Sequence, residues 1–164
     1  MKITNVLNQC SDFECIFELV KQSVESTMGR RRAGLMLGLM NLPMHIGAFH
    51  AIGTNFIVMN KRLLEKIVEA ADDPKLVNAY VFHILLHEYV HSLGFLDERE
   101  TQMLTYAISE KVLGKNHPAT IIGKYGIASV LPRIRDQNYT DRPERIGIIE
   151  IIQDFENDNL SYIG

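Results

Sequence analysis

Residues 72–97 of the chain read DDPKLVNAYVFHILLHEYVHSLGFLD. An aspartate followed by Pro74 is a strong start signal for a helix, because the aspartate can cap the first turn and proline needs no hydrogen-bond partner there. Gly94 is a typical stop signal, since glycine readily takes the left-handed conformation that ends a helix. We therefore expect a long helix from about residue 74 to Leu93, in a largely apolar stretch.

Within this helix, His87, Glu88 and His91 have the spacing of a metal site. Residues four apart leave the same face of a helix one turn apart, so the imidazoles of His87 and His91 can bind one Zn²⁺ ion. Glu88 lies beside the first histidine and can act as a general base toward an attacking water. This pattern predicts Zn²⁺ bound by His87 and His91, with Glu88 as the catalytic residue.

The elements around this helix predict an α+β protein. Ser11 and Glu14 form a capping-box pattern before a helix that ends at Gly29, and two apolar runs at 33–41 and 53–60 are typical of buried strands. Asn60 can cap a further helix, and the signals after Lys115 are weaker, with a short helix near Pro118 and a run at 146–155 that fits either strand or helix. No linker or repeat divides the sequence, so we expect one domain over residues 1–164.

Composition excludes several classes of protein. The chain has 164 residues, of which 46% are hydrophobic and 23% charged, as in an ordinary globular protein and unlike a disordered or coiled-coil one. The net charge is −3, which predicts no general attraction to nucleic acid, and the basic triplet Arg30-Arg31-Arg32 is more typical of a solvated strand entrance.

The charge-free stretch 33–60 is interrupted by Pro43 and by glycines, so no membrane span is expected. Cys10 and Cys15 lack metal-site spacing and the N-terminus lacks a secretory pattern, which predicts reduced thiols in the cytoplasm.

The third metal ligand is open among four acidic residues. Asp97 ranks first, because a turn at Gly94 can fold the chain back toward the ion, although Asp97 can also cap the next helix. Glu100 is the runner-up, one turn into that helix, and Glu98 and Glu110 follow. His83 lies eight residues before His91, about 12 Å along the helix axis, which is too far for one ion to join them. His45 and His50 lie in the loop between the two strands and have no informative spacing.

The segment from His87 to Asp97 resembles the zinc site of the zincin metallopeptidases. With Gly94 and Asp97 it is similar to the metzincin signature in the variant of the snapalysin proteases, while Glu98-Arg99-Glu100 is similar to the minimal glutamate zincins. The resemblance covers about eleven residues. It implies a zincin-like domain whose mixed, mostly parallel sheet has an antiparallel edge strand framing the cleft and packs on the active-site helix and on further helices. Residues 53–60 occupy the place of that edge strand.

The resemblance implies a zinc-dependent peptidase acting on peptide or protein substrates. Zinc on His87, His91 and Asp97 would polarise the scissile carbonyl, and Glu88 would take the proton of the water and pass it to the leaving amine. An oxyanion stabiliser is also needed, for which Tyr125, Tyr139, Arg133 and Arg135 are chemically eligible. No methionine follows Met103, so the methionine turn of metzincins has no counterpart in its usual place.

Two other functions remain open at this stage. A bacterial endoribonuclease family of ribosomal RNA maturation has three histidines on a similar helix, but here Asp97 replaces the last histidine and Glu88 replaces a glycine. The other is a regulatory module that binds zinc without catalysis. The sequence does not indicate an oligomeric state.

Overall fold

The computed structural model describes residues 2–134 and 149–156, and it confirms the α+β class in the form of a small mixed sheet covered by helices. The helices are α1 (Ile3–Gln9), α2 (Phe13–Met28), α3 (Lys61–Ala70), α4 (Pro74–Ser92), α5 (Glu98–Leu113) and α6 (Pro118–Tyr125), followed by the short 3-10 helices η1 (Ile127–Ser129) and η2 (Pro132–Ile134). The strands are β1 (Met36–Met40), β2 (Ala48–His50), β3 (Phe56–Asn60) and β4 (Glu150–Ile151).

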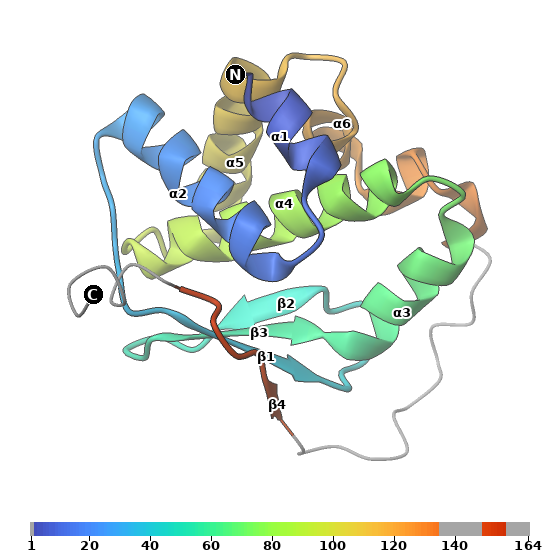
Figure 1. Ribbon diagram of the computed structural model, residues 1–164. Coiled ribbons are helices and arrows are strands. Elements are labelled where there is room, and N and C mark those ends of the chain that lie inside the picture. Colours follow the sequence, from blue (N-terminus) through green and yellow to red (C-terminus); the bar gives the residue numbers. More distant parts are fainter. Residues whose placement is uncertain (1, 135–148, 157–164) are drawn as a thin grey trace.

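Helix α4 lies at the centre of the fold. It runs between the sheet on one side and α1, α2 and α5 on the other, and it contacts all of them and α6 (Figure 1). Its apolar side chains point in several directions, as expected of a helix surrounded by protein. Those of Phe82, Leu85, Leu86, Tyr89 and Val90 are completely buried. The predicted start and stop are both present, since Asp73 accepts a hydrogen bond from Lys75 N and Gly94 has a φ of 108°.

The sheet has the strand order β2-β3-β1-β4. β1 and β3 are parallel, whereas β2 pairs antiparallel with β3 and β4 pairs antiparallel with β1. The sheet is therefore mixed, but it is not mostly parallel as the resemblance implied. Gly38 allows β4 to lie close to β1, because a Cβ at this position would be 2.6 Å from a side-chain carbon of Ile149.

The identity of the edge strand differs from the expectation. β3, which lies within the predicted run 53–60, is an interior strand between β2 and β1. The edge nearest α4 is β2, a strand of three residues in the segment that was expected to be a loop. β2 is too short to have a recognisable alternation of apolar residues, and its conformation depends on its pairing with β3.

The start of α2 also differs from the expectation. The residue that caps the helix is Asp12, whose carboxylate accepts a hydrogen bond from Cys15 N, and not Ser11. Cys10 and Cys15 form a disulfide bond across this cap, between α1 and α2. The prediction of reduced thiols is therefore wrong for this structure. Because disulfides persist mainly in oxidising compartments, the bond also counts against the predicted cytoplasmic location.

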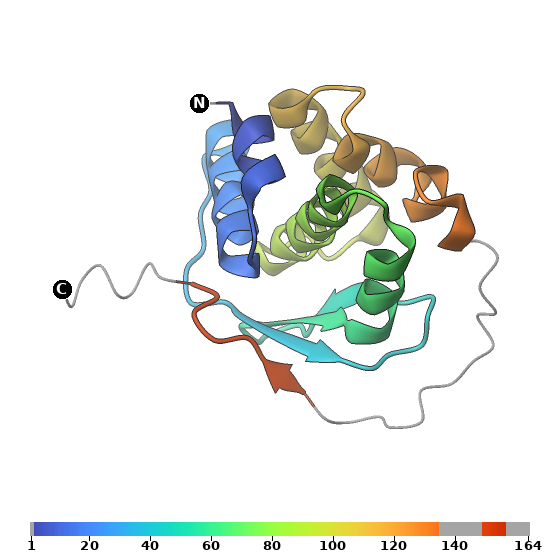
Figure 2. The ribbon, with the colours of Figure 1, turned by 45° about the vertical axis from the view of Figure 1, so that its right-hand side comes forward.

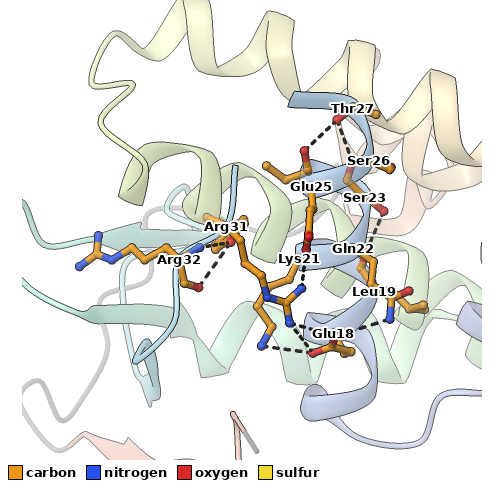
Figure 3. A network of polar contacts seen from close by, with 12 residues as sticks. Glu18, Leu19, Lys21, Gln22, Ser23, Glu25, Ser26, Thr27, Arg31 and Arg32 are labelled. Atoms are coloured by element: carbon orange, nitrogen blue, oxygen red, sulfur yellow. Dashed lines mark hydrogen bonds and ion pairs between the residues drawn. The ribbon is translucent and has the colours of Figure 1, made fainter. Parts of the chain in front are cut away.

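The basic triplet binds other parts of the chain. Arg31 reaches Glu18 and Glu25 on α2 (Figure 3). Arg30 and Arg32 donate to the carbonyl groups of Leu93 and Ser92 at the end of α4. Cations are favourable at this end of a helix, where carbonyl groups lack partners and the helix dipole is negative. The triplet therefore holds α2 and the end of α4 in place.

The C-terminal part of the described chain returns to the first strand and helix. Of the predicted run 146–155, residues 146–148 lie outside the described residues, and β4 occupies Glu150–Ile151 along β1 (Figure 2). Phe155 then stacks on Phe17 of α2, with ring centroids 4.2 Å apart. Among the helices that the structure describes, none combines the length and apolar character needed to cross a membrane.

Candidate metal centre

Two histidines on α4 lie next to each other at the surface of the helix. His87 and His91 are one turn apart, and their ring centroids are separated by 4.9 Å. Each side chain retains some exposure, 12% for His87 and 15% for His91. The two rings are therefore adjacent and accessible, as the spacing in the sequence predicts for a pair that shares one ion.

The carboxylate of Glu98 bridges these two imidazoles. Oε1 of Glu98 lies 2.8 Å from Nε2 of His87, and Oε2 lies 2.8 Å from Nε2 of His91. Glu98 is the first residue of α5, which follows the turn at Gly94. His87, His91 and Glu98 each offer one ligand atom, and these atoms lie within 4.8 Å of one another.

The orientation of His91 is fixed from its other ring nitrogen. Nδ1 of His91 is 2.7 Å from the carbonyl oxygen of Phe95, and because a carbonyl can only accept, Nδ1 carries the hydrogen. The hydroxyl of Thr101 donates to the same carbonyl oxygen. In the neutral imidazole, Nε2 then presents its lone pair toward Glu98, as a metal-ligating histidine does.

The contact between His91 and Glu98 provides a test of whether a metal fits. With Nδ1 protonated, Nε2 of a neutral His91 and the carboxylate of Glu98 are both hydrogen-bond acceptors, yet they lie 2.8 Å apart. This arrangement requires a cation between them, either a proton on Nε2 or a metal ion. Two imidazole nitrogens and one carboxylate oxygen form a donor set typical of catalytic zinc sites. The residues therefore fit a zinc ion.

Glu88 lies beside this group but does not belong to it. Its side chain is buried, with 5% exposure, and a backbone hydrogen bond joins it to His50 of β2. The second carboxylate oxygen, Oε2, is also buried and has no hydrogen-bond partner among the described residues. An unpartnered buried carboxylate oxygen is costly, so this atom is available to a ligand or to water at the site.

Burial changes the pKa values of Glu88, His87 and Glu98. Burial raises the pKa of Glu88 to about 7, in opposition to the charge of His91. Burial lowers the pKa of His87, although Glu98 acts in the other direction. Burial alone would raise the pKa of Glu98, but the nearby imidazoles of His87 and His91 lower it below its ordinary value. Glu88 is therefore the carboxyl group that can exchange a proton near neutral pH.

Two pockets meet at these residues. One has a volume of about 460 Å³ and is lined by His87, Glu88 and Glu98 together with His83 and Lys124. The other has a volume of about 180 Å³ and lies on the side of His91, where Ile52 and Leu96 form exposed apolar walls. The site is therefore open on both sides.

The third member of the group differs from the ranking based on sequence. Asp97, the first choice, caps α5 and accepts a hydrogen bond from Glu100 N at 2.8 Å. Neither Asp97 nor Glu100, the runner-up, belongs to the group of possible ligands among the described residues, and Glu110 does not belong to it either. Glu98 takes the place because it is the first helical residue, and side chains in a helix tilt toward its N-terminus, which here faces the site.

The remaining candidates lie in different places. His83 lies one turn before His87 and lines the larger pocket without joining the ligand group. Tyr125 is 68% exposed, and neither Tyr125 nor Arg133 lines the two pockets described above. Tyr139 and Arg135 lie outside the described residues. Lys124 also lines the larger pocket, and the sequence contains no signal for it, because a lysine on an amphipathic helix is common.

Comparisons of the chain with protein-family models, with curated proteins and with solved structures found no match.

Proposed function

We propose that the chain is a zinc-dependent peptidase in which His87, His91 and Glu98 hold the ion and Glu88 transfers protons. The position of Glu88 carries this proposal: its Oε2 atom is buried without a partner among the described residues, and its side chain lines the same two pockets as Glu98. A zinc site with a purely structural role does not require a buried carboxylate oxygen that has no hydrogen-bond partner. With Glu98 as third ligand, the site is more similar to the minimal glutamate zincins than to the snapalysin proteases.

The chain's own groups have separate tasks in this reaction. When bound, Zn²⁺ would act as a Lewis acid on a carbonyl group and lower the pKa of a water molecule toward neutrality. Glu88 accepts a proton from the attacking water at Oε2 and later donates it to the leaving amine. A pKa of about 7 suits a carboxyl group that must do both near neutral pH. The backbone hydrogen bond from β2 fixes the carboxylate in place.

The substrate is expected to bind in an extended conformation along β2. This strand is the edge of the described sheet that contacts α4, and it carries the backbone of His50 next to Glu88. An extended peptide can add to such an edge through main-chain hydrogen bonds. The peptide bond would then cross the site between the two pockets.

Substitution of Glu88 tests the proposal. Glu88→Gln keeps the size of the side chain but removes its basicity, so we expect stoichiometric zinc to remain bound while hydrolysis of a mixture of unstructured peptides falls at least about 100-fold. Glu100→Gln is the matched control, because Glu100 is an exposed glutamate outside the ligand group, and it should retain both properties. Zinc content is measured by elemental analysis and hydrolysis by mass spectrometry.

Two results would contradict the proposal. One is a wild-type protein that binds no zinc and is unaffected by chelators. The other is a Glu88→Gln variant that binds zinc and is as active as the wild type. If the wild type binds zinc but cleaves no peptide, the alternative of a non-catalytic zinc-binding module is supported instead.

A further inference from the structure

The larger pocket at the candidate metal centre also has a wall formed by α5 and α6. Gln102 of α5 and Lys124 of α6 line it, together with His87, Glu88 and Glu98. α6 packs against both α4 and α5, so these side chains come from a fixed part of the fold (Figure 1). We call Gln102 and Lys124 the donor wall, because both side chains end in hydrogen-bond donors.

Two aromatic rings hold the ammonium group of Lys124. Its Nζ atom lies 5.5 Å from the ring centroid of Tyr106 and 5.4 Å from that of Tyr125. Such contacts stabilise a cation without neutralising its charge. None of the ion pairs among the described residues includes Lys124. Its positive charge therefore has no carboxylate partner in the described part of the chain.

Gln102 connects this charge to the candidate metal centre. It lies one helical turn after Glu98 and one turn before Tyr106, and residues four apart lie on the same face of a helix. The side chain of Gln102 is exposed and forms no hydrogen bond with any described residue. From Glu98 to Tyr106, whose ring carries Lys124, the helix rises about 12 Å. An extended peptide spans this distance with about three or four residues.

The charges around the pocket favour an anionic group at the donor wall. Lys124 is the only lysine or arginine among the described residues that line this pocket. With Zn²⁺ bound, the carboxylates of Glu98 and Glu88 at most balance the two charges of the ion, and the charge of Lys124 remains without a counterpart. A second cation would be repelled by this charge, and a neutral group would gain little from it.

A carboxylate matches both members of the donor wall. Its oxygen atoms only accept hydrogen bonds, and a lysine ammonium and a glutamine amide can both donate to them. On the basis of the proposed peptidase function, we infer that Lys124 and Gln102 bind a carboxylate group of the substrate, about three or four residues from the cleaved bond. The C-terminus of a peptide and an acidic side chain both supply this group, and the experiment distinguishes them.

Binding of short peptides tests the donor wall independently of cleavage. The metal-free full chain is used, so that neither hydrolysis nor coordination to zinc contributes. The ligands are acetylated tetraalanine with a free C-terminus, the same peptide as its amide, and the amide with one alanine replaced by glutamate. We expect at least one carboxylate peptide to bind about fivefold more tightly than the neutral amide, as for an exposed ion pair. Binding is followed by NMR shifts of the methyl groups of Ile122, which lines the pocket.

Substitutions identify the group responsible. Lys124→Met keeps the length of the side chain but removes its charge, so the preference for the carboxylate peptide should disappear, whereas Lys124→Arg should retain it. Gln102→Ala should reduce the preference by about twofold through loss of one hydrogen bond. Lys111→Met is the matched control, because Lys111 is an exposed lysine of α5 outside the pocket and its loss changes the net charge equally.

Cleavage by the zinc-loaded protein supplies the second measurement. Peptides with a free C-terminus are compared with their amides, and amides with one glutamate at successive positions are compared with each other. We expect kcat/KM to be about fivefold higher where the carboxylate lies about three or four residues from the cleaved bond, and Lys124→Met to remove this difference.

The two measurements separate this inference from the proposed reaction. Equal binding of the three ligands, or a preference that Lys124→Met leaves unchanged, would overturn the inference even if peptides are cleaved. A preference for a carboxylate that Lys124→Met removes, without cleavage of any peptide by the wild type, would support the donor wall and refute the proposed reaction.

Discussion

At the scale of single residues, the start of α5 assigns different tasks to two adjacent carboxylates. Asp97 turns its side chain toward its own helix and binds Glu100 N, which satisfies a backbone group that would otherwise lack a partner. Glu98 is one position further along the chain and has one more methylene group. Its carboxylate reaches back to both His87 and His91. A cap and a candidate metal ligand can therefore be neighbours in the sequence.

Alanine substitutions should separate these two tasks. Glu98→Ala removes the candidate third ligand, and we expect zinc affinity to fall at least about 100-fold, by analogy with the losses seen when groups around a metal are removed. Asp97→Ala should destabilise the protein by about 1 kcal/mol through loss of the cap, with less than a tenfold change in affinity. Affinity is measured by competition with a chromophoric chelator, and stability by urea unfolding of the metal-free protein.

Glu100→Ala is the control for both measurements, because its side chain is exposed and belongs to neither task. If Asp97→Ala reduced zinc affinity as much as Glu98→Ala, the carboxylates would have to exchange places when the ion binds. The assignment of Glu98 would then be wrong.

The sequence predicted that His87 and His91 are adjacent but not that Glu98 is the carboxylate beside them, for a physical reason. His87, Glu88 and His91 lie on one regular helix, where the spacing alone determines which side chains are adjacent. The position of Glu98 depends on the path of the turn from Gly94 to Leu96 and on the packing of α5 against α4. Asp97 and Glu98 both follow this turn, and local sequence rules cannot decide which carboxylate points to the site.

At the scale of helices and strands, local capping signals define where helices begin. Asn60, Asp73, Asp97 and His117 each accept a hydrogen bond from the first turn of the helix that follows. The first three are caps that the sequence indicates, whereas at the last helix the sequence signal is Pro118. The elements that the sequence did not reveal are α1 and β2. Both are short. α1 depends on contacts with α4, which is distant in the sequence, and β2 depends on its pairing with β3, the next strand along the chain.

His117 gives one of these caps a dependence on pH. Its Nδ1 accepts a hydrogen bond from Ala119 N, which is possible only while the ring is neutral, and burial lowers the pKa of His117. The unfolded chain therefore takes up a proton at a pH where the folded chain does not. The contribution of the cap is complete above the ordinary histidine pKa of about 6.5 and is lost as the pH falls below it.

Replacement of this histidine should remove that part of the pH dependence. His117→Ser supplies a cap that does not titrate, so between pH 7 and pH 5 we expect the wild type to lose about 1 kcal/mol more stability than the variant. The free energy of unfolding is measured with urea at both pH values. An equal loss in the two proteins would show that His117 does not titrate as its position implies.

At the scale of the whole molecule, the sheet connects the C-terminal part of the described chain to the candidate site. β4 pairs with β1, β1 with β3, and β3 with β2, whose backbone holds Glu88. Beyond β4, Phe155 lies on Phe17, and Glu156 accepts a hydrogen bond from Gly34 N. The sequence signal for this segment is ambiguous, because two paired residues are too few to show a period and the stacked rings are far apart in the chain.

The stacked pair predicts how strongly this segment supports the fold. Phe155 is only 4% exposed, so Phe155→Ala should destabilise the protein by about 3 kcal/mol through loss of buried apolar surface and the cavity left behind. Ile151→Ala is the matched control, because Ile151 lies on β4 but is 46% exposed, and we expect a loss of about 1 kcal/mol at most. Both losses are read from urea unfolding of the metal-free protein. Because Phe155 does not contact the ligand group, zinc affinity measured without urea should remain that of the wild type in both variants. Equal destabilisation by the two substitutions would mean that β4 alone anchors the segment and that the contact between Phe155 and Phe17 contributes little.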